Sequence, residues 1–139
     1  NLAFLRLNPS FVLRDSRALA PVSPEDTSLI DALNQVMSED LAYTNHDLRI
    51  GELAATLKVP EYQLRRTINR SLGHQNFNQF INRYRVEEAA RRLVNEPRVP
   101  VLTIALDVGF RSISSFNTAF RAHYQKTPTD YRKSKRSNS

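Results

Sequence analysis

The pattern of apolar residues between positions 50 and 124 occurs twice, and this internal repeat limits the possible folds more than any other feature. The first part of the pattern recurs at an offset of 51 residues: Leu53, Ala54, Leu57 and Val59 against Ile104, Ala105, Val108 and Phe110. The second part recurs at an offset of 52 residues: Leu64, Ile68 and Leu72 against Phe116, Phe120 and Tyr124. The chain therefore contains two copies of one structural unit, with one extra residue in or just after the turn of the second copy.

Each copy has the spacing of two short helices joined by a tight turn. Apolar residues three and four positions apart form one face of a helix, whereas a strand would alternate them. Ala54 and Ala105 are small, which lets the two helices of a copy cross closely, and Gly109 lies at a turn where a positive φ is expected. This is the helix-turn-helix pattern. A single copy is a weak signal because many helical hairpins share it, whereas two linked copies are much more specific.

The segments around the repeat are also helical, so the predicted fold is all-α, with about seven helices. It comprises two homeodomain-like helix-turn-helix subdomains, a long bridging helix and an extra N-terminal helix, which the capping sequence Ser23-Pro24-Glu25-Asp26 starts and which is expected to run to about Ala42. The predicted segments are an N-terminal helix and loop (23–46), the first helix-turn-helix (50–73), the bridging helix (76–95), the second helix-turn-helix (101–124), a C-terminal helix (128–134) and a basic disordered tail (135–139).

Positive charge is concentrated in the part of the chain that holds the repeat. The net charge of the whole chain is +6. Residues 1–50 contain 4 Lys or Arg against 7 Asp or Glu, and residues 51–139 contain 16 against 7. A basic region of this kind favours a polyanionic partner, nucleic acid first and an acidic membrane second. For the charge excess alone, a merely solvated basic surface is an equal alternative.

Side chains for metal binding or catalysis are not grouped anywhere in the sequence. It has no cysteine and three glycines, which excludes disulfides, thiol nucleophiles and a glycine-rich phosphate loop. The histidines His46, His74 and His123 are scattered, without a carboxylate at metal-ligand spacing. We therefore expect no cofactor, no metal site and no enzymatic activity. No apolar run is long enough to span a membrane.

The second helix of each copy has a polar face opposite its apolar face. In the first copy this face shows Glu61, Tyr62, Gln63, Arg65, Arg66, Asn69 and Arg70. In the second copy it shows Arg111, Ile113, Ser114, Ser115, Asn117, Thr118 and Arg121. Long donors on an exposed helix suit base edges in a DNA major groove, and flanking arginines suit phosphates.

Three other sets of residues have both a structural and a DNA-binding interpretation. The aromatic residues Phe116, Phe120, Tyr124 and Tyr131 are expected in the core rather than as stacking platforms for single strands, because of their spacing. For Arg85 a salt bridge to Glu61, Glu87 or Glu88 is at least as well supported as a DNA contact. Thr127 is expected to cap a helix, whose free N–H groups would suit a phosphate.

The stretch IALDVGFRSISSFNTAFRAHYQKTPTDYR resembles the signature of the AraC/XylS transcription regulators. That signature is a helix ending in Ala-x-x-Val-Gly-Phe, then Ser-x-x-x-Phe-x-x-x-Phe and Thr-Pro-x-x-Tyr-Arg. The first copy and the helix after it, LAATLKVPEYQLRRTINRSLG and FINRYRVEEAARRL, match the other half of the pattern. The resemblance implies a DNA-binding domain over 47–134. Its two recognition helices would enter neighbouring major-groove segments of double-stranded DNA, about one turn apart.

The resemblance also assigns candidate roles to side chains. The base-contact candidates are Tyr62, Arg65 and Arg66 in the first copy and Ile113, Ser114, Ser115 and Thr118 in the second. The phosphate-contact candidates are Asn69, Arg70, Arg111, Ser112, Asn117, Arg121 and Thr127. The family often has arginine or lysine where this chain has Thr118. We therefore expect the first copy to be the stronger reader, and leave open whether the second reads bases or only anchors.

Most members of this family carry a sensing or dimerising domain before the DNA-binding half, and the resemblance implies activation by contact with RNA polymerase. Because the chain starts at Asn1 and shows no sustained period before Ser23, we expect 1–22 to be a linker or the end of such a domain. We expect this fragment to bind no effector, and a possible homodimer to form through that upstream domain. The expected location is the cytoplasm, at the nucleoid. The segment INRYRVEEA resembles a subset of the family with a membrane-embedded sensor.

Two alternatives to a sequence-specific regulator remain at this stage. One is an architectural DNA binder that is blind to sequence. The other is a protein-interaction module, in which the acidic helix predicted from Ser23 to Ala42 docks a partner and the basic surface is incidental.

Overall fold

The computed structural model describes residues 22–138, and its regular secondary structure there is entirely helical. Seven α-helices lie in this range: α2 (Pro24–Ser38), α3 (Ile50–Leu57), α4 (Glu61–Arg66), α5 (Phe77–Asn95), α6 (Val101–Asp107), α7 (Ile113–Tyr124) and α8 (Pro128–Arg136). A short 3-10 helix, η2 (Ala42–Thr44), follows α2, and a π-helical segment, η3 (Thr67–Ser71), continues α4. The all-α prediction is confirmed. The linker predicted over 1–22 lies, except for its last residue, outside the described residues.

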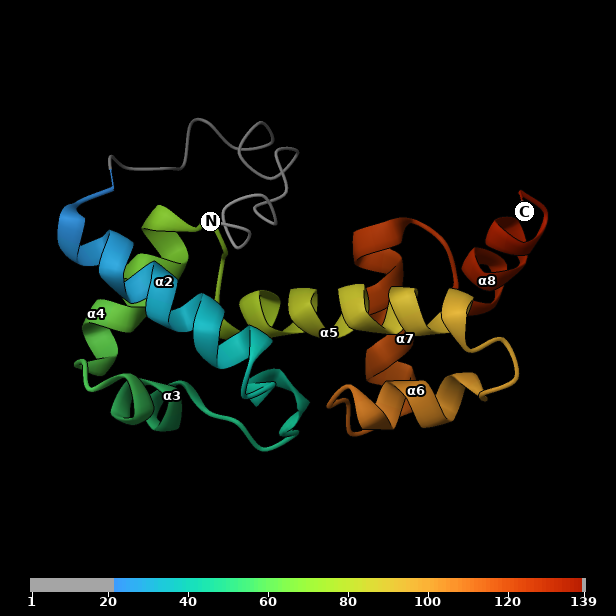
Figure 1. Cartoon of the computed structure of the whole chain (residues 1–139), viewed down its shortest axis with the longest axis horizontal. Helices are drawn as coiled ribbons and strands as arrows, with labels where there is room; N and C mark the ends of the chain where they lie inside the picture. The colour runs from blue at the N-terminus through green and yellow to red at the C-terminus, as the bar shows by residue number, and fades with distance from the viewer. Residues whose placement is uncertain (1–21, 139) are drawn as a thin grey trace.

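Helix α5 joins two separate hydrophobic cores. Figure 1 shows it along the long axis of the molecule, with α2, α3 and α4 around one end and α6, α7 and α8 around the other. Its N-terminal half contributes Phe80 and Ile81 to the core of the first subdomain, formed with α2, α3, α4 and η3. Its C-terminal half contributes Val86, Ala89 and Leu93 to the core of the second subdomain, formed with α6, α7 and α8. The bridging role predicted for this helix is confirmed.

The N-terminal helix α2 is an integral part of the first subdomain. Ser23 caps it by accepting a hydrogen bond from the backbone N–H of Asp26, and Leu33 and Met37 are fully buried against α3, α4 and α5. The helix ends at Ser38, four residues before the predicted end at Ala42. Acidic residues at the C-terminal end oppose the helix dipole, and Leu41, which the prediction placed inside the helix, is 45% exposed with a left-handed backbone.

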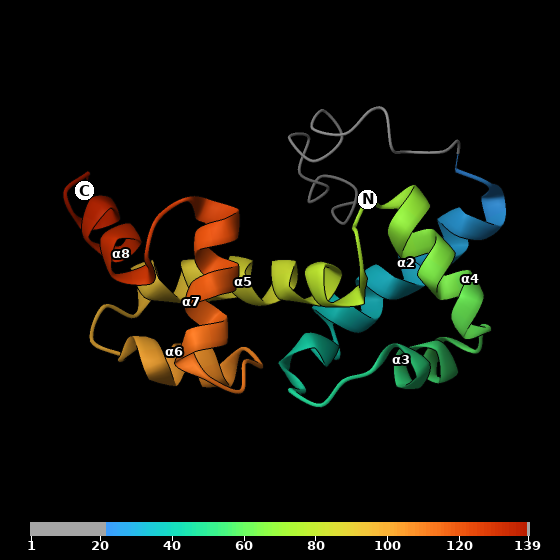
Figure 2. The same cartoon turned by 180° about the vertical axis from the view of Figure 1, so that it is seen from behind.

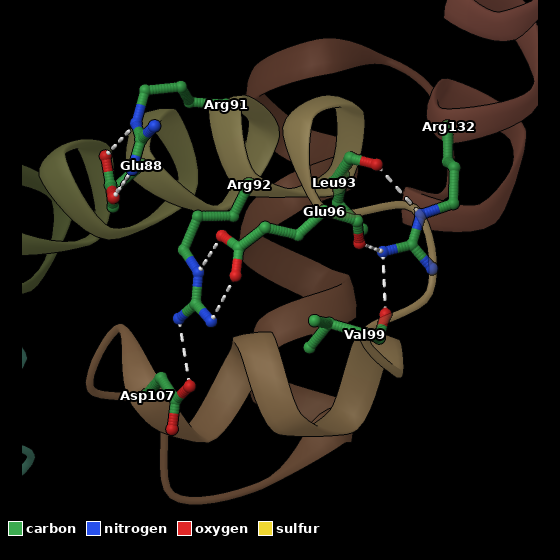
Figure 3. A network of polar contacts seen from close by, with 8 residues as sticks. All are labelled: Glu88, Arg91, Arg92, Leu93, Glu96, Val99, Asp107 and Arg132. Atoms are coloured by element: carbon green, nitrogen blue, oxygen red, sulfur yellow. Dashed lines mark hydrogen bonds and ion pairs between the residues drawn. The ribbon is translucent and has the colours of Figure 1, made fainter.

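Helix α8 is fixed to the end of α5 by Arg132. The guanidinium of Arg132 donates hydrogen bonds to the carbonyl oxygens of Leu93, Glu96 and Val99, at 2.9, 3.2 and 2.8 Å (Figure 3). These carbonyls end α5 and begin the connection to α6, where no intrahelical donor reaches them. Arg92 ties α5 to α6 through Asp107 at 2.9 Å. Helix α8, capped by Thr127, continues past its predicted end at residue 134 and includes Lys135 and Arg136. The prediction that the tail from residue 135 is disordered is therefore partly wrong.

The two subdomains touch at a second place, around Arg85. Its guanidinium donates hydrogen bonds to the carbonyl oxygens of Tyr43 (2.7 Å) and Asn45 (2.9 Å) and lies 5.7 Å from the centre of the Phe110 ring. Burial lowers the pKa of this group. Of the two interpretations given for Arg85, the salt bridge to Glu61, Glu87 or Glu88 is wrong, because main-chain carbonyls satisfy the guanidinium instead. The DNA contact stays a prediction.

Gly109 completes this contact from the second subdomain. Its φ is +113°, which confirms the positive φ expected there. A Cβ at this position would lie 2.4 Å from the carbonyl oxygen of Tyr43 and 2.7 Å from Nε of Arg85. Only glycine permits so close an approach. We call the contact between Arg85, Gly109 and the loop 42–47 the subdomain clamp.

Candidate nucleic-acid interface

Helix α4 is the exposed second helix of the first copy. Lys58 adopts a left-handed conformation that ends α3, and Pro60 precedes the first turn of α4 without needing a backbone N–H. Leu64 and Ile68 are fully buried and hold the helix against the core. The opposite face is therefore presented to solvent on a rigid support.

The base-contact candidates of the first copy lie on that exposed face. Tyr62 is 69% exposed, although it is a large aromatic residue, and Arg66 is exposed without an ion pair within residues 22–138. Arg65 is paired with Glu61 at 2.6 Å, one helical turn away. This pair is half exposed, so it contributes little to stability and leaves the Arg65 guanidinium available to a polyanion. Asn69 and Arg70 follow on η3 and are also exposed.

Helix α2 is hydrogen-bonded directly to the π-helical segment η3, which continues the recognition-helix candidate α4. The hydroxyl of Thr67, which is fully buried, donates to a carboxylate oxygen of Asp26 at 3.0 Å. Hydrogen bonds from Ser23 and Thr67 to the Asp26 carboxylate, together with the positive charge of Arg66, lower the pKa of Asp26. The N-terminal helix thus fixes the position of the segment that follows Arg66.

Helix α7 is the exposed second helix of the second copy. Ser112 caps it by accepting from the N–H of Ser115 at 3.2 Å, and the Ser112 and Ser115 hydroxyls lie 2.9 Å apart. Phe116 and Phe120 are fully buried and hold it to the core, as predicted. Phe120 also contacts Tyr124 and Tyr131, which are half-buried. The prediction that these aromatic residues belong to the core is confirmed.

Several polar candidates of the second copy are engaged within the protein. The Ser115 hydroxyl donates to the Ser112 carbonyl oxygen, and the Thr118 hydroxyl donates to that of Ser114 at 3.1 Å. Arg111 is paired with Asp47, across the two subdomains. Thr127 caps α8 by accepting from the N–H of Asp130 at 3.1 Å.

Five of the candidates, Thr118 among them, surround an open hollow on the surface of α7. It is lined by Ile113, Ser114, Asn117, Thr118 and Arg121. Ile113 is 37% exposed, and Arg121 is exposed on the next turn. The structure therefore brings together residues that sequence reasoning divided between base contacts and phosphate contacts.

The two exposed helices face the same side of the molecule. In Figure 2, α7 lies in front of α5 and α4 lies in front of α2, whereas in Figure 1 both lie behind them. One continuous partner can therefore reach both helices from one side. Between residues 22 and 138 no helix combines the length and apolarity of a membrane span, and no His, Asp and Glu side chains group as a metal site.

Comparison with known proteins identifies the domain. A family profile described as a helix-turn-helix domain matches residues 53–134. SoxS, a regulatory protein of Salmonella typhimurium, is 31% identical over 90 residues, which are 65% of this chain and 82% of SoxS. PocR, another regulatory protein of that organism, is 28% identical over 139 residues, which are 100% of this chain but 44% of PocR.

Solved structures agree with these relatives. The C-terminal domain of AraT, a response regulator from Geobacillus stearothermophilus, superposes with a TM-score of 0.65 and 26% identity, over 83% of this chain and 88% of that chain. The C-terminal domain of the response regulator yesN from Fusobacterium nucleatum gives a TM-score of 0.62 at 25% identity, over 78% of this chain and 98% of that chain. These proteins are regulators rather than enzymes, as the sequence predicts. The chain therefore belongs to the AraC/XylS family of helix-turn-helix transcription regulators and carries its DNA-binding domain.

Proposed function

We propose that this domain binds double-stranded DNA sequence-specifically, with α4 and α7 as recognition helices in two successive major-groove segments. The observation that carries the proposal is the placement of both helices towards the same side of the molecule, each held from behind by buried apolar residues. The 19 residues of α5 span about 28 Å at about 1.5 Å per residue. That length is comparable with one turn of B-DNA, about 34 Å.

In this proposal α4 supplies the larger share of base discrimination. Arg66 and Tyr62 project from it, and neither side chain forms a hydrogen bond with any residue of 22–138. Arg65 would exchange Glu61 for a base or phosphate. An arginine that binds guanine through both O6 and N7 contributes about 1–3 kcal/mol of discrimination. Asn69, Arg70 and Arg121 bind phosphates, which gives salt-dependent affinity.

Other candidate contacts lie at the ends of α7. Arg111 and Ser112 come directly before this helix, and Thr127 comes after it, at the start of α8. Ser112 and Thr127 cap these helices, so the adjacent backbone N–H groups are the donors for phosphates. Arg111 reaches a phosphate by giving up its ion pair with Asp47. This pair is exposed and therefore contributes little to stability.

The test compares Arg66→Ala with Arg98→Ala, which removes the same charge from the exposed connection between α5 and α6. A binding site is first selected from a random duplex library at physiological salt. We expect Arg66→Ala to weaken binding to that site about 5- to 150-fold, and to weaken binding to unrelated duplex far less. Arg98→Ala should change both only slightly. Equal losses on both duplexes for Arg66→Ala would identify a sequence-blind architectural binder instead.

We also propose the wider role that family membership suggests. The protein activates transcription by contact with RNA polymerase, at the nucleoid, as a domain spanning about 47–134 that follows the helix and loop of 23–46. Sensing of an effector, dimerisation and a membrane tether belong to a region upstream of 1–22. Because the chain spans 44% of PocR, a regulator of that length has room for such a region. Transcription in vitro with purified polymerase tests activation directly, and repression in that assay would contradict it.

A further inference from the structure

The internal repeat aligns the residues that line the hollow on α7 with residues on the exposed face of α4 and the start of η3. Its five lining residues, Ile113, Ser114, Asn117, Thr118 and Arg121, are each 52 positions after Glu61, Tyr62, Arg65, Arg66 and Asn69. The offset is the one that relates the buried residues of the same two helices. Asn117 therefore occupies in α7 the position that Arg65 occupies in α4.

Some polar side chains of α7 already form hydrogen bonds within the protein, and others do not. The Thr118 hydroxyl donates to the Ser114 carbonyl oxygen, and the Ser115 hydroxyl donates to that of Ser112. The amide of Asn117 forms no hydrogen bond with any residue between 22 and 138, although it is half-buried. An amide that lines an open hollow, with its donor and acceptor both unused, is ready for a partner that offers both.

We propose that Asn117 is the principal base-reading side chain of α7 and that it recognises adenine. The proposal rests on the DNA-binding function proposed above and deepens it. An asparagine amide binds adenine through N6 and N7 together, a match that no other base offers in the major groove. Ile113, which also lines the hollow and is 37% exposed, supplies an apolar surface for the methyl group of a thymine beside it. The second reader thus selects A·T-containing sequence, in place of the guanine that arginine readers prefer.

The test selects duplexes from a random library with the wild-type chain and with Asn117→Ala and Asn117→Asp. Asn95→Ala, at the exposed end of α5, is the matched control because it removes an asparagine outside both readers. The wild type should yield a motif with two elements, the second containing a strongly preferred A·T pair. Asn117→Ala should reduce the preference for that pair about 5- to 150-fold. Asn117→Asp, which only accepts hydrogen bonds, should shift it towards C·G, since cytosine N4 is a donor.

The outcomes separate this inference from the proposed function. The first element should stay unchanged in both Asn117 variants, which shows that they are folded and bound, and Asn95→Ala should reproduce the whole wild-type motif. An unchanged second element in both variants would overturn the role of Asn117 while leaving sequence-specific binding intact. A wild-type motif with only the first element would overturn base reading by α7 altogether. Retention of duplex without any motif would overturn the proposed function itself, and the role of Asn117 with it.

Discussion

The substitution Gly109→Ala tests the subdomain clamp with a single methyl group. Alanine at φ +113° is strained by about 1–3 kcal/mol. The new Cβ would also lie 2.7 Å from Nε of Arg85 and 2.4 Å from the carbonyl oxygen of Tyr43. Arg85 must then release that carbonyl, and a lost hydrogen bond to a charged group costs about 1.5–3 kcal/mol. We therefore expect Gly109→Ala to lower the free energy of unfolding by about 2.5–6 kcal/mol.

Urea unfolding followed by circular dichroism measures this change, and thermal unfolding should show Tm lower by about 10–24 °C in a domain of this size. Gly51→Ala is the matched control. Gly51 lies in the first turn of α3, where an added Cβ would meet only the flexible end of Glu61, at 3.3 Å. Alanine is the better helix former there, so stability should stay the same or rise by up to about 1 kcal/mol. If Gly109→Ala unfolds within 1 kcal/mol of the wild type, the clamp is not under the steric constraint described.

Two further predictions concern pH and salt. Burial, with a smaller effect of Arg83, lowers the pKa of His74 from 6.5 to about 4. Unfolded chains therefore take up a proton below pH 6.5 that the folded protein accepts only near pH 4, so stability should fall by about 3 kcal/mol as pH drops through that window. Denaturant titrations across this range should show the slope in the wild type and a smaller one in His74→Phe. For salt, Arg70→Ala should reduce the slope of log affinity against log salt by about 1 on every duplex, and an unchanged slope would remove Arg70 from the phosphate contacts.

Most of the fold could be predicted from sequence because it depends on local periodicity. The apolar triplets of α4 and α7, the caps at Ser23, Ser112 and Thr127, and the glycine at the second turn all carry short-range signals. The π-helical segment after Arg66 had no such signal. It accompanies a buried hydroxyl, that of Thr67, whose partner Asp26 lies 41 residues earlier in the chain.

The candidate site was predicted less completely, for a related reason. Exposure of Tyr62, Arg65 and Arg66 follows from the helical period of α4. The helical period does not show whether a side chain contacts a residue far away in the sequence. The contacts of Arg85 with Tyr43 and of Arg111 with Asp47 were therefore not predicted. The role proposed for Asn117 had a signal in the sequence, since the offset of 52 already aligns it with Arg65.

The subdomain clamp has a consequence for the DNA as well as for the protein. Where two readers are joined by a flexible linker, the protein can adjust to an operator by changing its own shape. Here Arg85 and Gly109 hold the second subdomain against the loop of the first. If the distance between α4 and α7 differs from one turn of B-DNA, the duplex therefore has to bend or twist to contact both helices. Bending a duplex is easier at TA and CA/TG steps than in stiff A-tracts. Base pairs between the two elements, which no side chain touches, should therefore influence affinity through their stiffness.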